Sequence, residues 1–116
     1  MKFYRPGRWS DAQILEEHAF CAELAEREIP VVAPLAPGGA TLHRSGGHRF
    51  AVYPRQGGRA PEFDRSDTLK WMGRFIGRIH AVGALRRFAA RPVLDVASFG
   101  EQPRAWLLEH GFVPAE

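Results

Sequence analysis

Apolar positions recur at helical spacing over about Asp11 to Arg27, and this pattern predicts the first helix of the chain. Ser10 is followed three residues later by Gln13, which is the capping-box pattern found at helix starts. The pair Ile29-Pro30 marks the end, because the residue before a proline avoids the helical region. On a helical wheel one side collects the apolar side chains, which are Ile14, Phe20, Cys21, Leu24 and Ala25.

Glu17 falls within this apolar stripe, whereas Glu16 falls outside it. A carboxylate among apolar side chains costs free energy unless it is paired or hydrogen-bonded. One interpretation places Glu17 at the edge of the stripe, where it reaches water. The other gives it a buried cation, and Lys2, one of only two lysines, is the natural candidate because a short strand is expected just before the helix.

The next segment predicts an extended connector followed by a β-hairpin. "IPVVAPLAPGGA" contains three prolines and a glycine pair, so little ladder pairing is expected there. "TLHR" and "RFAVYP" are short apolar runs on either side of "SGGH", which is the pattern of two strands joined by a glycine turn. Tyr53-Pro54 is expected to stop the second strand.

The second half of the chain predicts helices. "RQGGRAPEFDR" is a glycine-rich loop able to act as a hinge, and a helix is expected from Ser66 or Asp67, either of which could cap it, to about Val82. Gly73 and Gly77 would permit another backbone to approach it closely. A further helix is expected over Pro103–Glu109. The long helix has a broad apolar face, formed by Leu69, Met72, Phe75, Ile76, Ile79 and Val82.

Composition and charge narrow the class of protein. The 116 residues are 45% hydrophobic and 25% charged, which is typical of one small globular domain. The net charge of +3 comes mainly from scattered arginines, so we expect no nucleic-acid partner, and we interpret "LRRFAARP" as a solvated loop rather than a contact for an anionic partner. With the single Cys21, no metal-ligand spacing among the histidines and no long apolar stretch, we expect a cytoplasmic protein without a metal site or membrane segment.

Four segments together resemble the bacterial stress response kinase A family, Ser/Thr protein kinases of the aminoglycoside-phosphotransferase and choline-kinase-like group. They are "KFYRPGRWSDAQILEEHAF", "IPVVAP", "FAVYPRQGGR" and "MGRFIGRIHAVG", and the likeness continues through "RPVLDVASFGEQPRAWLLEHGFVP". It spans nearly the whole chain but only about a third of a family member. The resemblance implies ATP and Mg²⁺ as cofactors and a protein substrate.

The resemblance also implies roles for individual residues. Lys2 matches the strand lysine that holds the nucleotide phosphates, and Glu17 matches its glutamate partner on the following helix. "FAVYPRQGG" matches the segment that binds adenine through backbone groups, here the carbonyl of Tyr53 and the amide of Arg55. Lys2, Glu17, Tyr53 and Arg55 are therefore the expected nucleotide-binding residues.

The expected fold is α+β, a partial protein-kinase-like fold in which a small antiparallel sheet with one packed helix precedes helices of a second lobe. Residues 1–56 would be part of the ATP-binding lobe, and residues 57–116 the hinge loop and the first helical part of the catalytic lobe. The 116 residues contain no glycine-rich hairpin before Lys2, no HGD-type motif and no DLDD-like stretch. We therefore assign no catalytic residue and expect the chain alone to be inactive, and either marginally stable or prone to self-associate through an unpaired sheet edge.

Two alternatives remain at this point. The chain could be a non-catalytic protein that uses the kinase-like scaffold for binding or regulation. It could also be a small basic domain of unrelated function.

Overall fold

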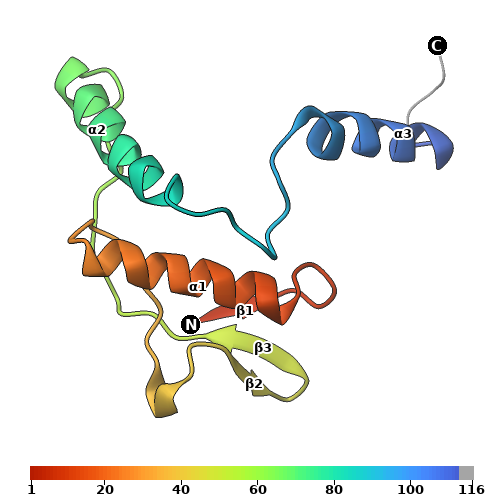
Figure 1. Ribbon diagram of the computed structural model, residues 1–116, viewed down its shortest axis with the longest axis horizontal. Helices are drawn as coiled ribbons and strands as arrows, with labels where there is room; N and C mark the ends of the chain where they lie inside the picture. Colours follow the sequence, from red (N-terminus) through yellow and green to blue (C-terminus); the bar gives the residue numbers. More distant parts are fainter. Residues whose placement is uncertain (113–116) are drawn as a thin grey trace.

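The computed structural model describes residues 1–112 and has an α+β fold (Figure 1). Its sheet is antiparallel, with three strands in the order β1-β3-β2. The strands are β1 (Lys2–Tyr4), β2 (His43–Ser45) and β3 (His48–Ala51). In the register of β1 and β3, Lys2 lies opposite Ala51, so the predicted lysine strand is paired directly with the strand that leads to Tyr53.

The predicted hairpin is confirmed, with a tight turn between β2 and β3. Gly46 and Gly47 have φ angles of +54° and +79°, and two successive positive φ values are what a two-residue hairpin turn requires. The connector before the hairpin contains only a short 3₁₀ turn, Pro37–Gly39. The amide of Leu35 donates to the carbonyl of Val52 at 2.8 Å, which ties the connector to the chain just after β3.

Helix α1 (Asp11–Glu26) has both predicted boundaries within one residue. At its start the capping box is complete, because the Gln13 amide donates to Ser10 Oγ and the Ser10 amide donates to Gln13 Oε1. The side chain of Asp11 accepts hydrogen bonds from Arg44 of β2 and Arg49 of β3, so this end of the helix is tied to the hairpin.

The other end of α1 is closed by a Schellman motif. The amide of Glu28 donates to Ala25 O and that of Ile29 to Leu24 O, both at 3.0 Å, while Glu28 adopts a φ of +55°. Ile29 and Leu24 are both buried and pack together, as is usual in this motif. The helix therefore ends through its own capping contacts as well as through Pro30.

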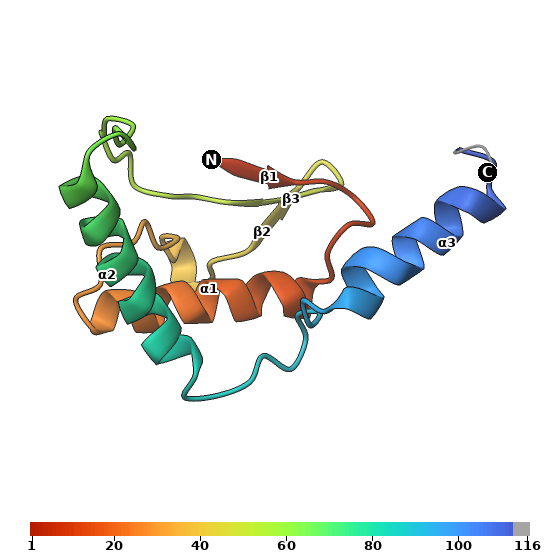
Figure 2. The same cartoon turned by 90° about the horizontal axis from the view of Figure 1, so that it is seen from above.

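Two apolar clusters hold α1 from different sides. Tyr4, Ile14 and Ala51 are buried between α1 and the sheet. Leu24 and Ile29 pack against Val82 of α2 (Ser66–Gly83), so α2 crosses α1 near its C-terminal end (Figure 2). The wheel was wrong at Ala25, which is exposed, and it missed His18, which is buried.

Helix α2 differs from the prediction at its ends and along its exposed side. Its N-cap is Arg65 without a side-chain hydrogen bond, so neither Ser66 nor Asp67 caps it, and Gly83 is its last residue. A Cβ at Gly73 or Gly77 would meet no described atom within 4 Å, so the close approach expected there does not occur among residues 1–112. Within this range no helix is both long enough and apolar enough to cross a membrane.

Helix α3 (Gln102–Glu109) follows a π-helical turn, Ala97–Glu101, and stands away from the rest of the molecule in both views (Figures 1 and 2). This accounts for a radius of gyration of 18.1 Å, when a compact domain of this length has about 13 Å. The helix ends at Glu109, as predicted, and Gly111 beyond it has a φ of +67°. Large side chains of this region are exposed, including Val96, Phe99, Trp106 and Phe112.

Candidate functional site

The strand lysine and the helix glutamate meet across the gap between β1 and α1. Lys2 Nζ lies 3.1 Å from Glu17 Oε1, and their side chains are 48% and 30% exposed. Both interpretations of Glu17 therefore hold in part. It lies at the edge of the buried stripe, and Lys2 is its cation, although Lys2 is exposed and not buried as expected. Lys2 and Glu17 come together because β1 and α1 share the cluster around Tyr4 and Ile14.

A second cation, Arg91, approaches the same carboxylate from the segment after α2. Arg91 Nη1 lies 3.2 Å from Glu17 Oε2, a charge pair that lacks hydrogen-bond geometry. The Arg91 guanidinium also lies over the Trp9 ring, 4.5 Å from its centroid. The two oxygens of Glu17 thus face two different cations, Lys2 and Arg91.

Glu16 is the residue of this region that sequence reasoning missed. Its carboxylate accepts three consecutive backbone hydrogen bonds, from Ala89 at 2.6 Å, Ala90 at 2.9 Å and Arg91 at 2.8 Å. These amides, that of Ala89 foremost, lower the pKa of Glu16. No sequence pattern indicated this contact, because the donors are main-chain groups more than 70 residues away.

The interpretation of "LRRFAARP" as a solvated loop holds only in part, because Leu85 to Ala89 are exposed but the segment also contacts α1. Besides the three amides on Glu16, Arg86 binds Glu23 and Arg91 pairs with Glu17. The anionic partner of the segment is helix α1 of the same chain.

Beneath the Lys2–Glu17 pair lies a buried polar network centred on His18, which is 3% exposed. Its Nε2 is 2.7 Å from the hydroxyl of Tyr4, and its Nδ1 is 2.8 Å from the hydroxyl of Thr41. The hydroxyl of Tyr53 lies 3.3 Å from that of Tyr4. Burial lowers the pKa of His18 and raises that of Tyr4, so both side chains are neutral at pH 7. The network joins β1, α1, the connector and the segment after β3.

Tyr53 and Arg55 follow β3 at the same end of the sheet as Lys2. The Val52 carbonyl is already occupied by the Leu35 amide. Neither the Tyr53 carbonyl nor the Arg55 amide forms a backbone hydrogen bond within residues 1–112. The predicted adenine-binding groups are therefore free of backbone partners in the part of the chain that is described.

Carboxylate, imidazole and thiol groups do not cluster into a metal site in the described range. No group of three or more Asp, Glu, His and Cys side chains lies close enough to hold an ion. Asp95, the only aspartate with a lowered pKa apart from Asp11 among residues 1–112, accepts from the Ser98 side chain and amide in a local turn.

A small antiparallel sheet, a helix packed on it and a lysine–glutamate pair between them are features of the nucleotide-binding lobe of kinase-like phosphotransferases. The model of the phosphotransferase enzyme family matches residues 1–111, and the chain belongs to this family.

Curated relatives agree with this assignment. The chain is 43% identical over 115 residues to stress response kinase A of Salmonella choleraesuis and to serine/threonine protein kinase RdoA of Salmonella typhimurium. It is 41% identical to stress response kinase A of Escherichia coli K12. The alignments cover 99% of this chain but 35% of each relative, so the chain spans about a third of the length of these proteins.

Proposed function

We propose that this chain is the nucleotide-holding part of an ATP-dependent Ser/Thr protein kinase, with Lys2 contacting the α- and β-phosphates and Glu17 orienting Lys2. The observation that carries the proposal is the 3.1 Å pair between Lys2 Nζ and Glu17 Oε1. It joins a strand to the following helix, as phosphate-holding pairs do in kinases. The names of the curated relatives agree with this function.

Stability does not explain the Lys2–Glu17 pair. Both side chains are partly exposed, and exposed ion pairs contribute only about 0–1 kcal/mol to folding. An ammonium that is accessible yet held by one carboxylate still has donors for phosphate oxygens. The geometry therefore suits a ligand better than it suits a structural role.

In the same proposal, the adenine ring lies against the segment after β3. The Tyr53 carbonyl would accept from the base and the Arg55 amide would donate to it. Pro54 between them has no amide to contribute. The absence of backbone partners for these two groups within residues 1–112 supports this assignment.

Mg²⁺ and the protein substrate of the kinase would be held by residues other than those described here. Within residues 1–112 no cluster of metal ligands supports a Mg²⁺ site. Residues 1–56 and 57–116 would belong to the two lobes of the kinase. We also infer a cytoplasmic location, because ATP is the proposed ligand and the single Cys21 forms no disulfide within the chain.

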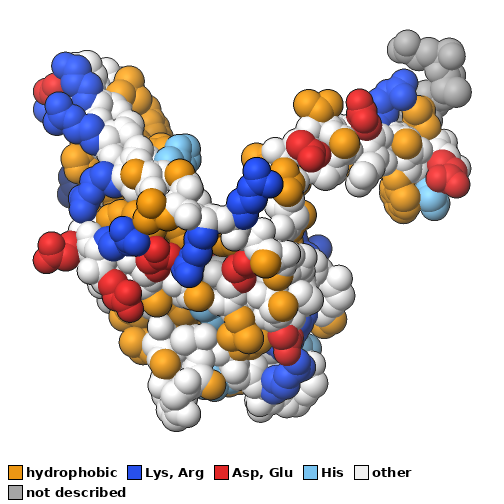
Figure 3. Space-filling model, in the orientation of Figure 1, with side chains coloured by type: hydrophobic (Ala, Val, Ile, Leu, Met, Phe, Trp, Pro, Cys, Tyr) orange, Lys and Arg blue, Asp and Glu red, His pale blue; other side chains and the backbone are white. Residues whose placement is uncertain are grey.

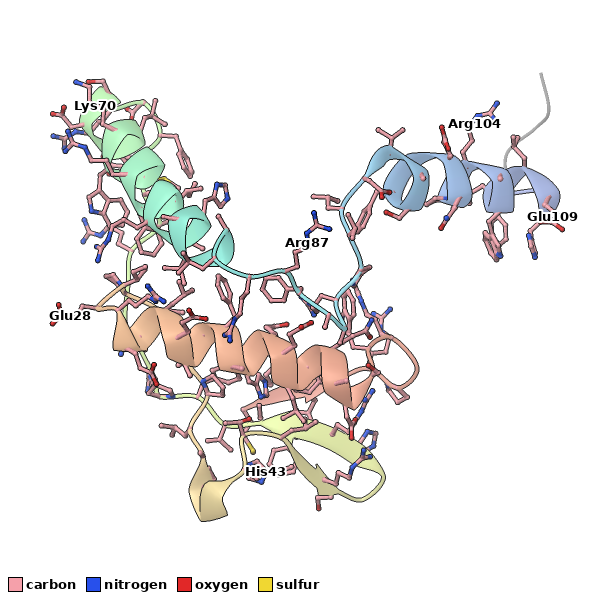
Figure 4. All side chains as sticks on the ribbon, viewed as in Figure 1. Glu28, His43, Lys70, Arg87, Arg104 and Glu109 are labelled. Carbon is pink, nitrogen blue, oxygen red and sulfur yellow. The ribbon has the colours of Figure 1, made fainter. Side chains whose placement is uncertain are left out.

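Calorimetry with a non-hydrolysable ATP analogue tests the proposal on the chain. Lys2→Ala should weaken binding about 10- to 100-fold, because hydrogen bonds to charged groups contribute roughly 1.5–3 kcal/mol. Lys70→Ala is the matched control, since Lys70 is the only other lysine and lies at the far end of α2 (Figure 4).

Equal affinities for the wild type and Lys2→Ala would contradict the phosphate role of Lys2. Absence of any nucleotide binding would contradict the proposed function as a whole and would favour the non-catalytic alternative. Circular dichroism of each variant establishes that the fold is retained.

A further inference from the structure

Helix α1 is contacted by other parts of the chain on two opposite sides. The sheet lies on one side of it, and the segment that follows α2, residues 84–96, lies on the other (Figures 1 and 2). Acidic side chains of α1 and basic side chains of this segment and α2 face one another there (Figure 3). The contacts include Glu23 with Arg86 and Glu17 with Arg91.

Glu16 fixes the segment at one point along α1. Three consecutive amides on one carboxylate make a directional contact, because each hydrogen bond constrains the backbone of Ala89, Ala90 or Arg91. A long side chain such as lysine or arginine could pair with Glu16 from many positions. The amides hold the main chain itself, and Arg91 is the last residue they hold.

The side chain of Arg91 is then directed to Glu17. Stacking on Trp9 restricts the plane of the guanidinium, and its Nη1 approaches the Glu17 oxygen that Lys2 does not contact. A carboxylate with a single exposed partner has rotational freedom that weakens positioning. With cations facing both oxygens, Glu17 is held in one orientation relative to Lys2.

We propose that Arg91 is a positioning residue for the Lys2–Glu17 pair, and that Glu16 anchors the segment that brings Arg91 there. This inference rests on the proposed nucleotide function. It links the orientation of the Lys2–Glu17 pair to the chain beyond α2. A movement of residues 84–96 would therefore change the position of Lys2 and its affinity for phosphate.

The test combines nucleotide affinity with a double-mutant cycle. Arg91→Met should weaken binding of the ATP analogue roughly threefold to tenfold, toward the lower end of the couplings found between residues of one charged network. The same substitution should have no further effect in a Glu17→Gln background, because Arg91 acts through that carboxylate. Arg91→Lys, which keeps the charge, should retain most of the affinity. Arg87→Met is the control, since Arg87 lies on the same segment but points away from α1 (Figure 4).

Amide hydrogen exchange tests the anchor without nucleotide. Glu16→Gln should speed exchange at Ala89, Ala90 and Arg91 about fivefold or more while leaving the amides of β3 unchanged. Unchanged exchange at the three amides would overturn the role of Glu16.

The outcomes separate this inference from the proposed function. If Lys2→Ala weakens nucleotide binding and Arg91→Met does not, the role of Arg91 is overturned and the proposed function stands. Additive losses in the cycle would assign Arg91 a structural role. If the wild type binds no nucleotide, the proposed function fails and the role of Arg91 fails with it.

Discussion

The sheet with α1 encloses a buried core, whereas the helices beyond residue 60 leave most of their large apolar side chains exposed. In the first region Ile14 and Ala51 are fully buried and a histidine is buried with hydrogen-bond partners on both nitrogens. In the second, only Val82 is buried among the described residues, and Trp71, Phe99 and Trp106 are each about half exposed or more. A domain gains stability by burying apolar surface, so the second region requires a covering surface that residues 1–112 do not supply.

This difference agrees with the share of the relatives that the chain spans, which is 35%. The apolar face of α2 is long and regular, yet only its C-terminal half, from Phe75 to Val82, packs against α1. The first region supplies its own core, and we expect it to carry most of the stability of the chain.

The largest expected effect is at Ile14. Ile14→Ala should lower the free energy of unfolding by about 2–5 kcal/mol, because the cavity opens in the one cluster shared by α1 and the sheet. Leu15→Ala in α1 and Leu107→Ala in α3 are controls, since these side chains are partly exposed and each should cost less than about 1 kcal/mol. Urea denaturation followed by circular dichroism measures all three. Similar losses at Ile14 and Leu107 would remove the contrast between the regions.

The buried histidine gives the first region a pH dependence. Because burial lowers the pKa of His18 below its usual 6.5, the unfolded chain binds a proton more readily than the folded chain does. The fold is therefore most stable above that value, and part of the free energy of unfolding should be lost as the pH falls from 7 to 5.

His48→Gln, on the exposed tip of the hairpin, should keep this loss between pH 7 and 5, and His18→Gln should abolish it. If His18→Gln does not fold, an NMR titration of the wild type gives the answer directly. A His18 pKa at or above 6.5 would contradict the prediction.

Self-association, expected from the sequence to use the unpaired sheet edge, should depend more on the exposed apolar side chains of the second region. Leu69 is 52% exposed on α2, and Leu69→Lys should weaken association about tenfold, since burying a leucine contributes roughly 1.5–3 kcal/mol. Ala81→Lys adds the same charge at an exposed α2 position and should have a smaller effect. Sedimentation measures both. A monomeric wild type with a sharp cooperative melt would contradict the prediction.

The smallest expected effect compares the starts of α1 and α2. Ser10→Ala should cost about 1 kcal/mol, because its hydroxyl accepts from the Gln13 amide. Ser66→Ala should be close to neutral, because α2 has no side-chain cap at its start. Thermal melts of the two variants give the comparison, and equal shifts in Tm would argue against it.

Local sequence signals predicted the elements of the fold closely. The capping box at Ser10 and the glycine turn at Gly46-Gly47 each determine backbone geometry within a few residues, and both are present. Ser66 failed as a predicted cap because Arg65 takes that position. The Lys2–Glu17 contact was also predicted, since both residues belong to adjacent elements in the chain.

What the sequence alone determined are these short-range features, together with the family that the motifs indicate. Only the tertiary structure decided the burial of His18, the three amides on Glu16 and the approach of Arg91 to Glu17. These contacts join residues far apart in the chain. The donors to Glu16 are main-chain amides, which almost every residue has, and the contact with Glu17 uses one of many arginines. Periodicity cannot encode them, because their geometry follows from how α1 is held between the sheet and residues 84–96.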